Sequence, residues 1–155
     1  MTVDVRTEID MDVPRETVAA YAMDPDNATI WYENIRSVTW ETPKPLGIGS
    51  RFAFVARFLG RRLAYVYEVR ELVPGQRFVM STAQGPFPME TSYEWEDTST
   101  GGTRMTIRNR GEPSGLSKVA VPMMSRAMHR ANNKDLNRLK VILESGTAQS
   151  ISKAG

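Results

Sequence analysis

The residues of this chain that could do chemistry are few, and the most informative are two polar residues on one predicted helix. Asp135 projects near the middle of an apolar stripe at helical spacing, and Asn132 lies close to it. The stripe is made by Val121, Met124, Met128 and Leu139. Two interpretations stay open: Asp135 faces a partly polar cavity, or the stripe is misphased and Asp135 is solvated or paired with an arginine. A buried carboxylate needs a partner, so the first interpretation requires one.

Other kinds of catalytic chemistry find little support in the sequence. The chain has no cysteine and a single histidine, His129, which rules out thiolate chemistry and a multi-histidine metal site. His129 falls toward the edge of the helical stripe, so we expect it at the surface. A dehydratase needs a positioned general acid or base, and Asp135 with Tyr65 or Tyr67 could supply one. We expect no metal and no cofactor, and we assign no catalytic residue.

Length and composition describe one domain without targeting signals. The 155 residues predict a single domain over 1–146, followed by a small, polar and disordered tail over 147–155. The net charge of +2 and the scattered basic residues argue against a nucleic-acid partner. The N-terminal residues lack a signal-peptide pattern, and no apolar run could span a membrane. We therefore expect a cytoplasmic protein without stable membrane insertion, and a homodimer is compatible with these features.

The order of predicted elements defines the fold. A strand over 3–11 precedes two short helices over 14–23 and 28–34. Six further strands are predicted near 37–42, 51–58, 63–69, 77–83, 89–96 and 104–109. A long helix over 116–144, with Gly146 as its cap, comes last. Consecutive hairpins imply an antiparallel sheet, and only the long helix can cover its buried face. The sequence thus predicts an α+β fold in which a curved, seven-stranded antiparallel sheet wraps around the C-terminal helix.

The inward positions of these strands predict either a ligand cavity or a filled core. They are rich in aromatic residues and methionine, including Phe52, Trp95 and Met105. Methionine adapts its shape to ligands, and buried tyrosine hydroxyls need partners, which favours a cavity; a filled core stays open. From their common phase we expect one enclosed, ligand-binding space to be lined by Trp31, Phe54, Tyr65, Tyr67, Phe78, Tyr93, Met124, Met128 and Asp135.

Short motifs along the chain resemble those of a known superfamily. They are VPRETV at 13–18, Asp24-Pro25, Trp31, IGS at 48–50, ELVPGQRF at 71–78 and LNRLK at 136–140. In this order, over about 3–144, the chain resembles the START-related helix-grip (SRPBCC) superfamily and its polyketide cyclase/dehydratase-like branch. The resemblance implies a cavity between the sheet and the final helix. No catalytic set carries over, because the enzymes of this superfamily use different residues.

Two functions are compatible with such a cavity. In the first, the chain binds a hydrophobic small molecule, such as a lipid or polyketide, as a carrier or sensor. In the alternative, the chain is a cyclase, aromatase or dehydratase that uses acid/base residues in the same cavity. In both, the expected partner is a hydrophobic small molecule, and the residues alone do not name it.

Overall fold

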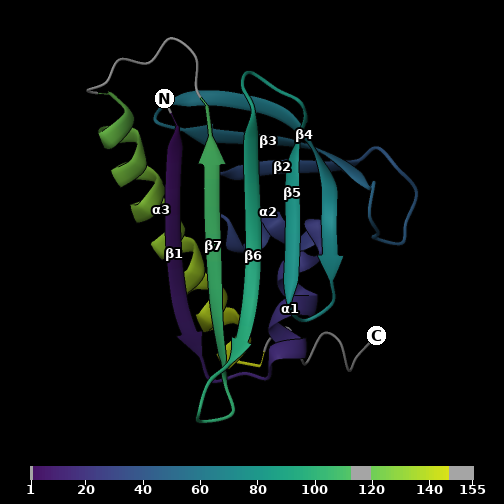
Figure 1. Ribbon diagram of the computed structural model, residues 1–155, viewed down its shortest axis with the longest axis vertical. Helices are drawn as coiled ribbons and strands as arrows, with labels where there is room; N and C mark the ends of the chain where they lie inside the picture. The colour runs from purple at the N-terminus through teal and green to yellow at the C-terminus, as the bar shows by residue number, and fades with distance from the viewer. Residues whose placement is uncertain (1, 113–119, 147–155) are drawn as a thin grey trace.

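One antiparallel sheet and one long helix make up most of the protein (Figure 1). The computed structural model describes residues 2–112 and 120–146. Its elements are β1 (Val3–Met11), α1 (Arg15–Met23), the 3-10 turn η1 (Pro25–Asn27), α2 (Ala28–Trp31), β2 (Ile35–Trp40), β3 (Arg51–Phe58), β4 (Arg61–Val73), β5 (Arg77–Gln84), β6 (Met89–Asp97), β7 (Thr103–Gly111) and α3 (Ala120–Glu144). The predicted seven-stranded sheet, the two short helices and the long C-terminal helix are confirmed.

The sheet runs in the order β1-β7-β6-β5-β4-β3-β2, and every neighbouring pair is antiparallel. The chain thus passes from β2 to β7 through consecutive neighbours. β1 pairs with β7, from Val3 opposite Gly111 to Met11 opposite Thr103. α1 and α2 carry the chain from β1 at one edge to β2 at the other. Alternate residues of most strands face the interior, and this alternation places the side chains of the site.

Two boundaries near the short helices differ from the predictions. α2 ends at Trp31, three residues early, because Tyr32 adopts an extended backbone with φ −85° and ψ 121°. β2 begins at Ile35, opposite Ala56, instead of at residue 37. The positive φ of 77° at Gly146 fits the predicted helix cap. The predicted first turn of the long helix, at 116–119, and the predicted disordered tail, at 147–155, lie outside the described residues.

The hydrophobic core lies under the C-terminal half of α3. Leu136, Leu139 and Leu143 are at most 1% exposed and pack with buried residues of the sheet such as Met105 and Ile107. Farther toward the N-terminal end of α3, Met124 and Met128 are only half-buried. The interior is therefore filled beside one half of the helix and less tightly packed beside the other.

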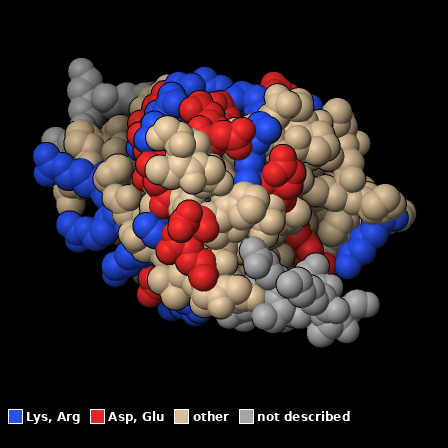
Figure 2. All heavy atoms as spheres, turned by 90° about the horizontal axis from the view of Figure 1, so that it is seen from below, with Lys and Arg blue, Asp and Glu red and all other residues tan. Residues whose placement is uncertain are grey.

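Charged residues cover the outer face of the sheet and one end of the protein. On the outer face, Arg108 pairs with Asp4 at 2.7 Å and Arg104 with Asp10 at 2.8 Å. Figure 2 shows acidic side chains at the end where the C-terminal half of α3 packs. Around a hollow there lie Asp10, Asp12, Glu96, Asp97 and Glu144. No helix within the described residues is long and apolar enough to cross a membrane.

The packing of α3 predicts unequal effects of two alanine substitutions. Leu139 is fully buried, so Leu139→Ala should lower the free energy of unfolding by about 2–5 kcal/mol. Val141, two residues away, is 67% exposed, so Val141→Ala should change it by less than about 0.5 kcal/mol. Urea unfolding of both variants measures the difference. Equal losses would show that α3 does not pack through this face.

Candidate functional site

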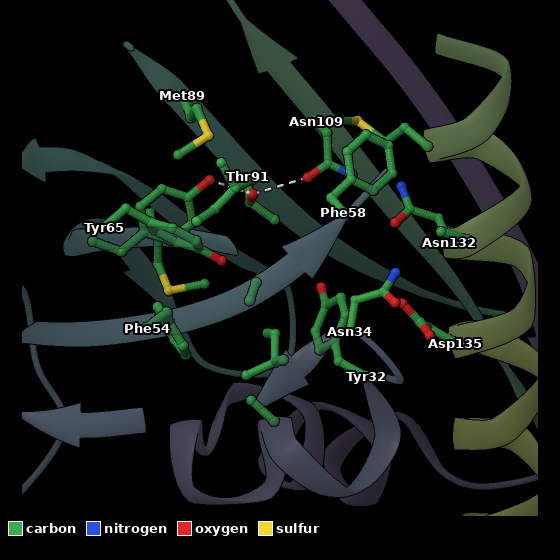
Figure 3. A pocket seen from close by; sticks show the side chains of 18 of the residues that line it. Tyr32, Asn34, Phe54, Phe58, Tyr65, Met89, Thr91, Asn109, Asn132 and Asp135 are labelled. Carbon is green, nitrogen blue, oxygen red and sulfur yellow. Dashed lines mark hydrogen bonds between the residues drawn. The ribbon is translucent and has the colours of Figure 1, made fainter. Parts of the chain in front are cut away.

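A cavity of about 160 Å³ lies between the sheet and the N-terminal half of α3 (Figure 3). Strands β3 to β7 supply most of its wall, and the segment from α1 to β2 supplies one side. Most of the wall is apolar, with several aromatic rings and methionines. Arg57 and Arg110 belong to the wall and are exposed, so they mark where the cavity reaches the surface.

The structure brings together all of the predicted site residues but one. The cavity wall includes Phe54, Tyr65, Tyr67, Phe78, Tyr93, Met124, Met128 and Asp135. The prediction for Trp31 is wrong, because this residue does not line the cavity. Its indole is fully buried in the core, with its ring centroid 4.0 Å from that of Tyr32. Because α2 ends at Trp31, the extended residue Tyr32 takes the place in the wall that was predicted for the indole.

The alternative of a filled core holds in one part of the predicted inner face. Three residues of this face are at most 2% exposed and do not line the cavity: Phe52, Trp95 and Met105. Phe52 packs against Trp40 with ring centroids 4.8 Å apart. The same face of the sheet therefore carries a packed core at one end and a cavity at the other.

Asp135 is buried in the cavity wall and has a partner. The residue is 2% exposed, and its Oδ1 accepts a hydrogen bond of 3.1 Å from the backbone N–H of Glu33. Burial raises the pKa of Asp135 to about 6, although the hydrogen bond from Glu33 opposes this effect. The carboxylate forms no ion pair with an arginine of the described residues. Asp135 is thus neither solvated nor paired with arginine.

Tyrosine hydroxyls form a second polar group in the wall. The hydroxyls of Tyr32 and Tyr93 lie 2.5 Å apart and share a hydrogen bond. Burial raises the pKa of both phenols well above the usual value, so both stay neutral. The Tyr32 hydroxyl ties the segment after α2 to β6 across the floor of the cavity.

A chain of hydrogen bonds crosses the sheet side of the cavity (Figure 3). Thr91 Oγ1 donates to Asn109 Oδ1 at 2.9 Å. The Tyr67 hydroxyl therefore donates to Thr91 Oγ1, also at 2.9 Å, because the single proton of the threonine is already used. Burial raises the pKa of Tyr67 to about 12. Sequence reasoning missed Thr91 and Asn109 as site residues, although both are polar residues at inward positions of their strands.

Asn132 is the other polar residue of α3 in the cavity wall. It is 5% exposed, and its Nδ2 has no hydrogen-bond partner within the described part of the chain. Figure 3 shows its amide projecting into the cavity, one helical turn from Asp135. Sequence reasoning placed Asn132 near Asp135 but did not select it. Its helical spacing from the buried Leu136, Leu139 and Leu143 is the signal that could have done so.

The single histidine is absent from the described cavity wall. Within residues 2–112 and 120–146, no group of three or more histidine and acidic side chains could hold a metal ion. His129 is exposed on α3, as expected, and its Nδ1 lies 3.2 Å from Thr7 Oγ1. The titratable residues of the cavity wall are four tyrosines, the acidic residues Asp24, Glu90 and Asp135, and the two arginines at its opening.

Solved structures of several proteins are similar to this chain. TTHA0849 from Thermus thermophilus is 18% identical, with a TM-score of 0.79 over 92% of this chain and 98% of that one. A START superfamily protein from Mycobacterium smegmatis is 14% identical, with a TM-score of 0.78 over 92% and 97%. The Zhui aromatase/cyclase from Streptomyces sp. R1128 is 12% identical, with a TM-score of 0.79 over 95% and 96%. At these identities the likeness shows the fold.

Sequence comparison shows the family. No curated protein matches the chain. The profile of one family, described as polyketide cyclase / dehydrase and lipid transport, matches residues 2–144, which is nearly all of the chain. The helix-grip architecture, with α3 held against the curved sheet, agrees with this match. The chain therefore belongs to the polyketide cyclase/dehydrase and lipid transport family.

Proposed function

We propose that the chain binds a compact hydrophobic molecule in the cavity between the sheet and α3, as a carrier or sensor. One observation carries the proposal: the interior is closely packed under the C-terminal half of α3 but holds a cavity of about 160 Å³ beside the other half. Protein interiors are normally filled to the density of organic crystals, with few voids larger than a water molecule. A cavity of this size therefore needs a reason, and a ligand supplies one.

The dimensions and lining of the cavity describe the ligand. Apolar cavities of about 150 Å³ accept benzene, so a molecule built on about one ring fits the volume. Phe54, Phe78 and the tyrosines of β4 and β6 offer flat apolar surfaces. Met124 and Met128 on α3 can change rotamer to fit ligands of different shape. The few polar groups fix orientation, as in most small-molecule sites.

Filling the cavity should abolish binding without unfolding the protein. Met128→Trp places an indole in the open volume, so it should remove the binding of a compact, uncharged apolar probe, toluene, while unfolding stays cooperative. Met123→Trp is the matched control, because Met123 is 68% exposed and absent from the cavity wall. Calorimetric titration and urea unfolding give the two readouts.

Two outcomes would count against a ligand cavity. If Met128→Trp unfolds the protein and the parent never binds the probe, the space behaves as packed core, where overpacking typically costs about 1–3 kcal/mol. If Met123→Trp abolishes binding as completely as Met128→Trp, the probe binds on the surface. Native mass spectrometry of the purified parent complements this test by searching for a co-purified molecule.

An enzyme of the cyclase or dehydratase type is the second candidate, and Asp135 is the observation that favours it. A general acid or base works best when its pKa lies near the working pH, and the pKa of Asp135 is raised to about 6. The neighbouring hydroxyls of Tyr32 and Tyr93 could bind an oxygen of a substrate. The similarity in fold to the Zhui aromatase/cyclase is compatible with this candidate.

The titration of Asp135 should make the free energy of unfolding depend on pH. The pKa is about 6 in the folded protein and about 3.9 in an unfolded chain, so the folded state holds the proton more tightly. This group therefore lowers the free energy of unfolding as pH rises from about 4 to about 6. Asp135→Asn stays neutral and keeps an oxygen for the Glu33 N–H. At about pH 8 we expect the variant to be more stable by on the order of 1–3 kcal/mol.

Urea unfolding of parent and variant at several pH values checks this prediction, because the difference between the two proteins cancels the other carboxylates. An advantage of the same size at about pH 4 and about pH 8 would show that the carboxylate is not desolvated.

The same substitution separates the two candidate functions. If Asp135 only orients a ligand, Asp135→Asn should weaken binding modestly, because one hydrogen bond contributes about 0.5–1.5 kcal/mol. If it is a catalytic acid or base, turnover of a true substrate should collapse while binding survives. Calorimetry and an activity assay on the same preparation measure both, and turnover that survives in Asp135→Asn would remove the residue from the mechanism.

A further inference from the structure

We propose that Asn132 is the specificity-determining residue of the cavity, and that its side-chain amide selects a compact, uncharged molecule carrying an oxygen acceptor. The inference rests on the proposed function, because it concerns the ligand of the same cavity. It adds what neither the family nor the fold specifies: which polar atom of the wall recognises the ligand, and which chemical group that atom requires.

The observation that supports this inference is a buried hydrogen-bond donor without a partner in the cavity wall. Asn132 is 5% exposed and its Nδ2 has no partner among the described residues, whereas buried polar groups nearly always have one. Among the described residues, the other buried side-chain nitrogens without a hydrogen bond belong to Arg15, Trp31 and Trp95, and none of these lines the cavity. Asn132 Nδ2 is thus the buried unpartnered donor within reach of a ligand, and an oxygen of that ligand would satisfy it.

A second amide on the opposite wall supports the same acceptor. Thr91 donates to Asn109 Oδ1, and this fixes the orientation of the Asn109 amide so that its nitrogen is available on the other side. Both asparagines belong to the cavity wall, and both project into it in Figure 3, from β7 and from α3. Asn132 is the more buried of the two, so its donor has less access to water.

The charge of the neighbouring carboxylate decides which oxygen acceptor fits. Asp135 lies three residues from Asn132 on α3, so the two side chains are about 5–6 Å apart. Above pH 6 the Asp135 carboxylate is mostly ionised, and it would repel an acid group bound at Asn132. A ketone, ester or hydroxyl oxygen accepts the same hydrogen bond without this repulsion. The site therefore favours uncharged ligands over carboxylates of similar shape.

Three probes of similar size test the proposal on the intact protein at about pH 8. Ethylbenzene has no acceptor, acetophenone has a ketone oxygen, and benzoate has a charged carboxylate. By isothermal titration calorimetry we expect acetophenone to bind about tenfold more tightly than ethylbenzene, which corresponds to about 1.4 kcal/mol, and benzoate to bind most weakly. Asn132→Leu should remove the preference for acetophenone by weakening that ligand alone. Asn133→Leu, at a neighbouring position outside the cavity wall, should keep the preference.

A second measurement does not depend on the folding of any variant. In a ¹H–¹⁵N spectrum of the parent, the side-chain amide signals of Asn132 should shift with acetophenone more than with ethylbenzene. Equal affinity for ethylbenzene and acetophenone, or a preference that persists in Asn132→Leu, would overturn this inference and leave the proposed function standing. If none of the three probes binds to the parent, the proposed function fails, and this inference fails with it.

Discussion

The burial of one half of α3 against the concave face of the sheet is the interaction on which the rest of the structure depends. Leu136, Leu139 and Leu143 are excluded from water there, and each buried leucine contributes about 1.5–3 kcal/mol relative to an exposed one. This packing fixes the direction of the helix, so its other half extends over the sheet without filling the space beneath. The anchored half therefore creates the cavity, and the cavity needs no separate element to form it.

The two walls of the cavity are held together by different kinds of contact. On the sheet side, hydrogen bonds link Tyr67, Thr91 and Asn109 across β4, β6 and β7, and the Tyr32–Tyr93 pair ties in the segment after α2. Such directional contacts hold side chains in one geometry. On the helix side, Met124 and Met128 meet the cavity with flexible apolar side chains. A rigid wall thus faces an adaptable one.

The sequence predicted the fold because alternation along strands and periodicity along a long helix each repeat many times. The same periodicity correctly predicted eight residues of the cavity wall, including Asp135. Periodicity does not predict the position of Trp31, because α2 has only four residues. A small shift of the end of this helix decides whether the indole of Trp31 or the phenol of Tyr32 faces the cavity. Periodicity also cannot distinguish a core position from a cavity position. Phe52 and Phe54 lie on the same face of β3, but only Phe54 lines the cavity. That difference depends on where α3 is anchored, which is a tertiary property.

The pairing of β1 with β7 has a consequence for how the protein forms during synthesis. β1 leaves the ribosome early, yet its partner strand lies about a hundred residues later, with Val3 opposite Gly111. Until β7 emerges, β1 has no sheet to join, and β6 stands as an exposed edge. Contacts so distant in sequence slow folding, and uncovered edges invite pairing with other chains. A nascent chain that stalls before β7 would therefore be a substrate for chaperones, because it lacks both β7 and α3.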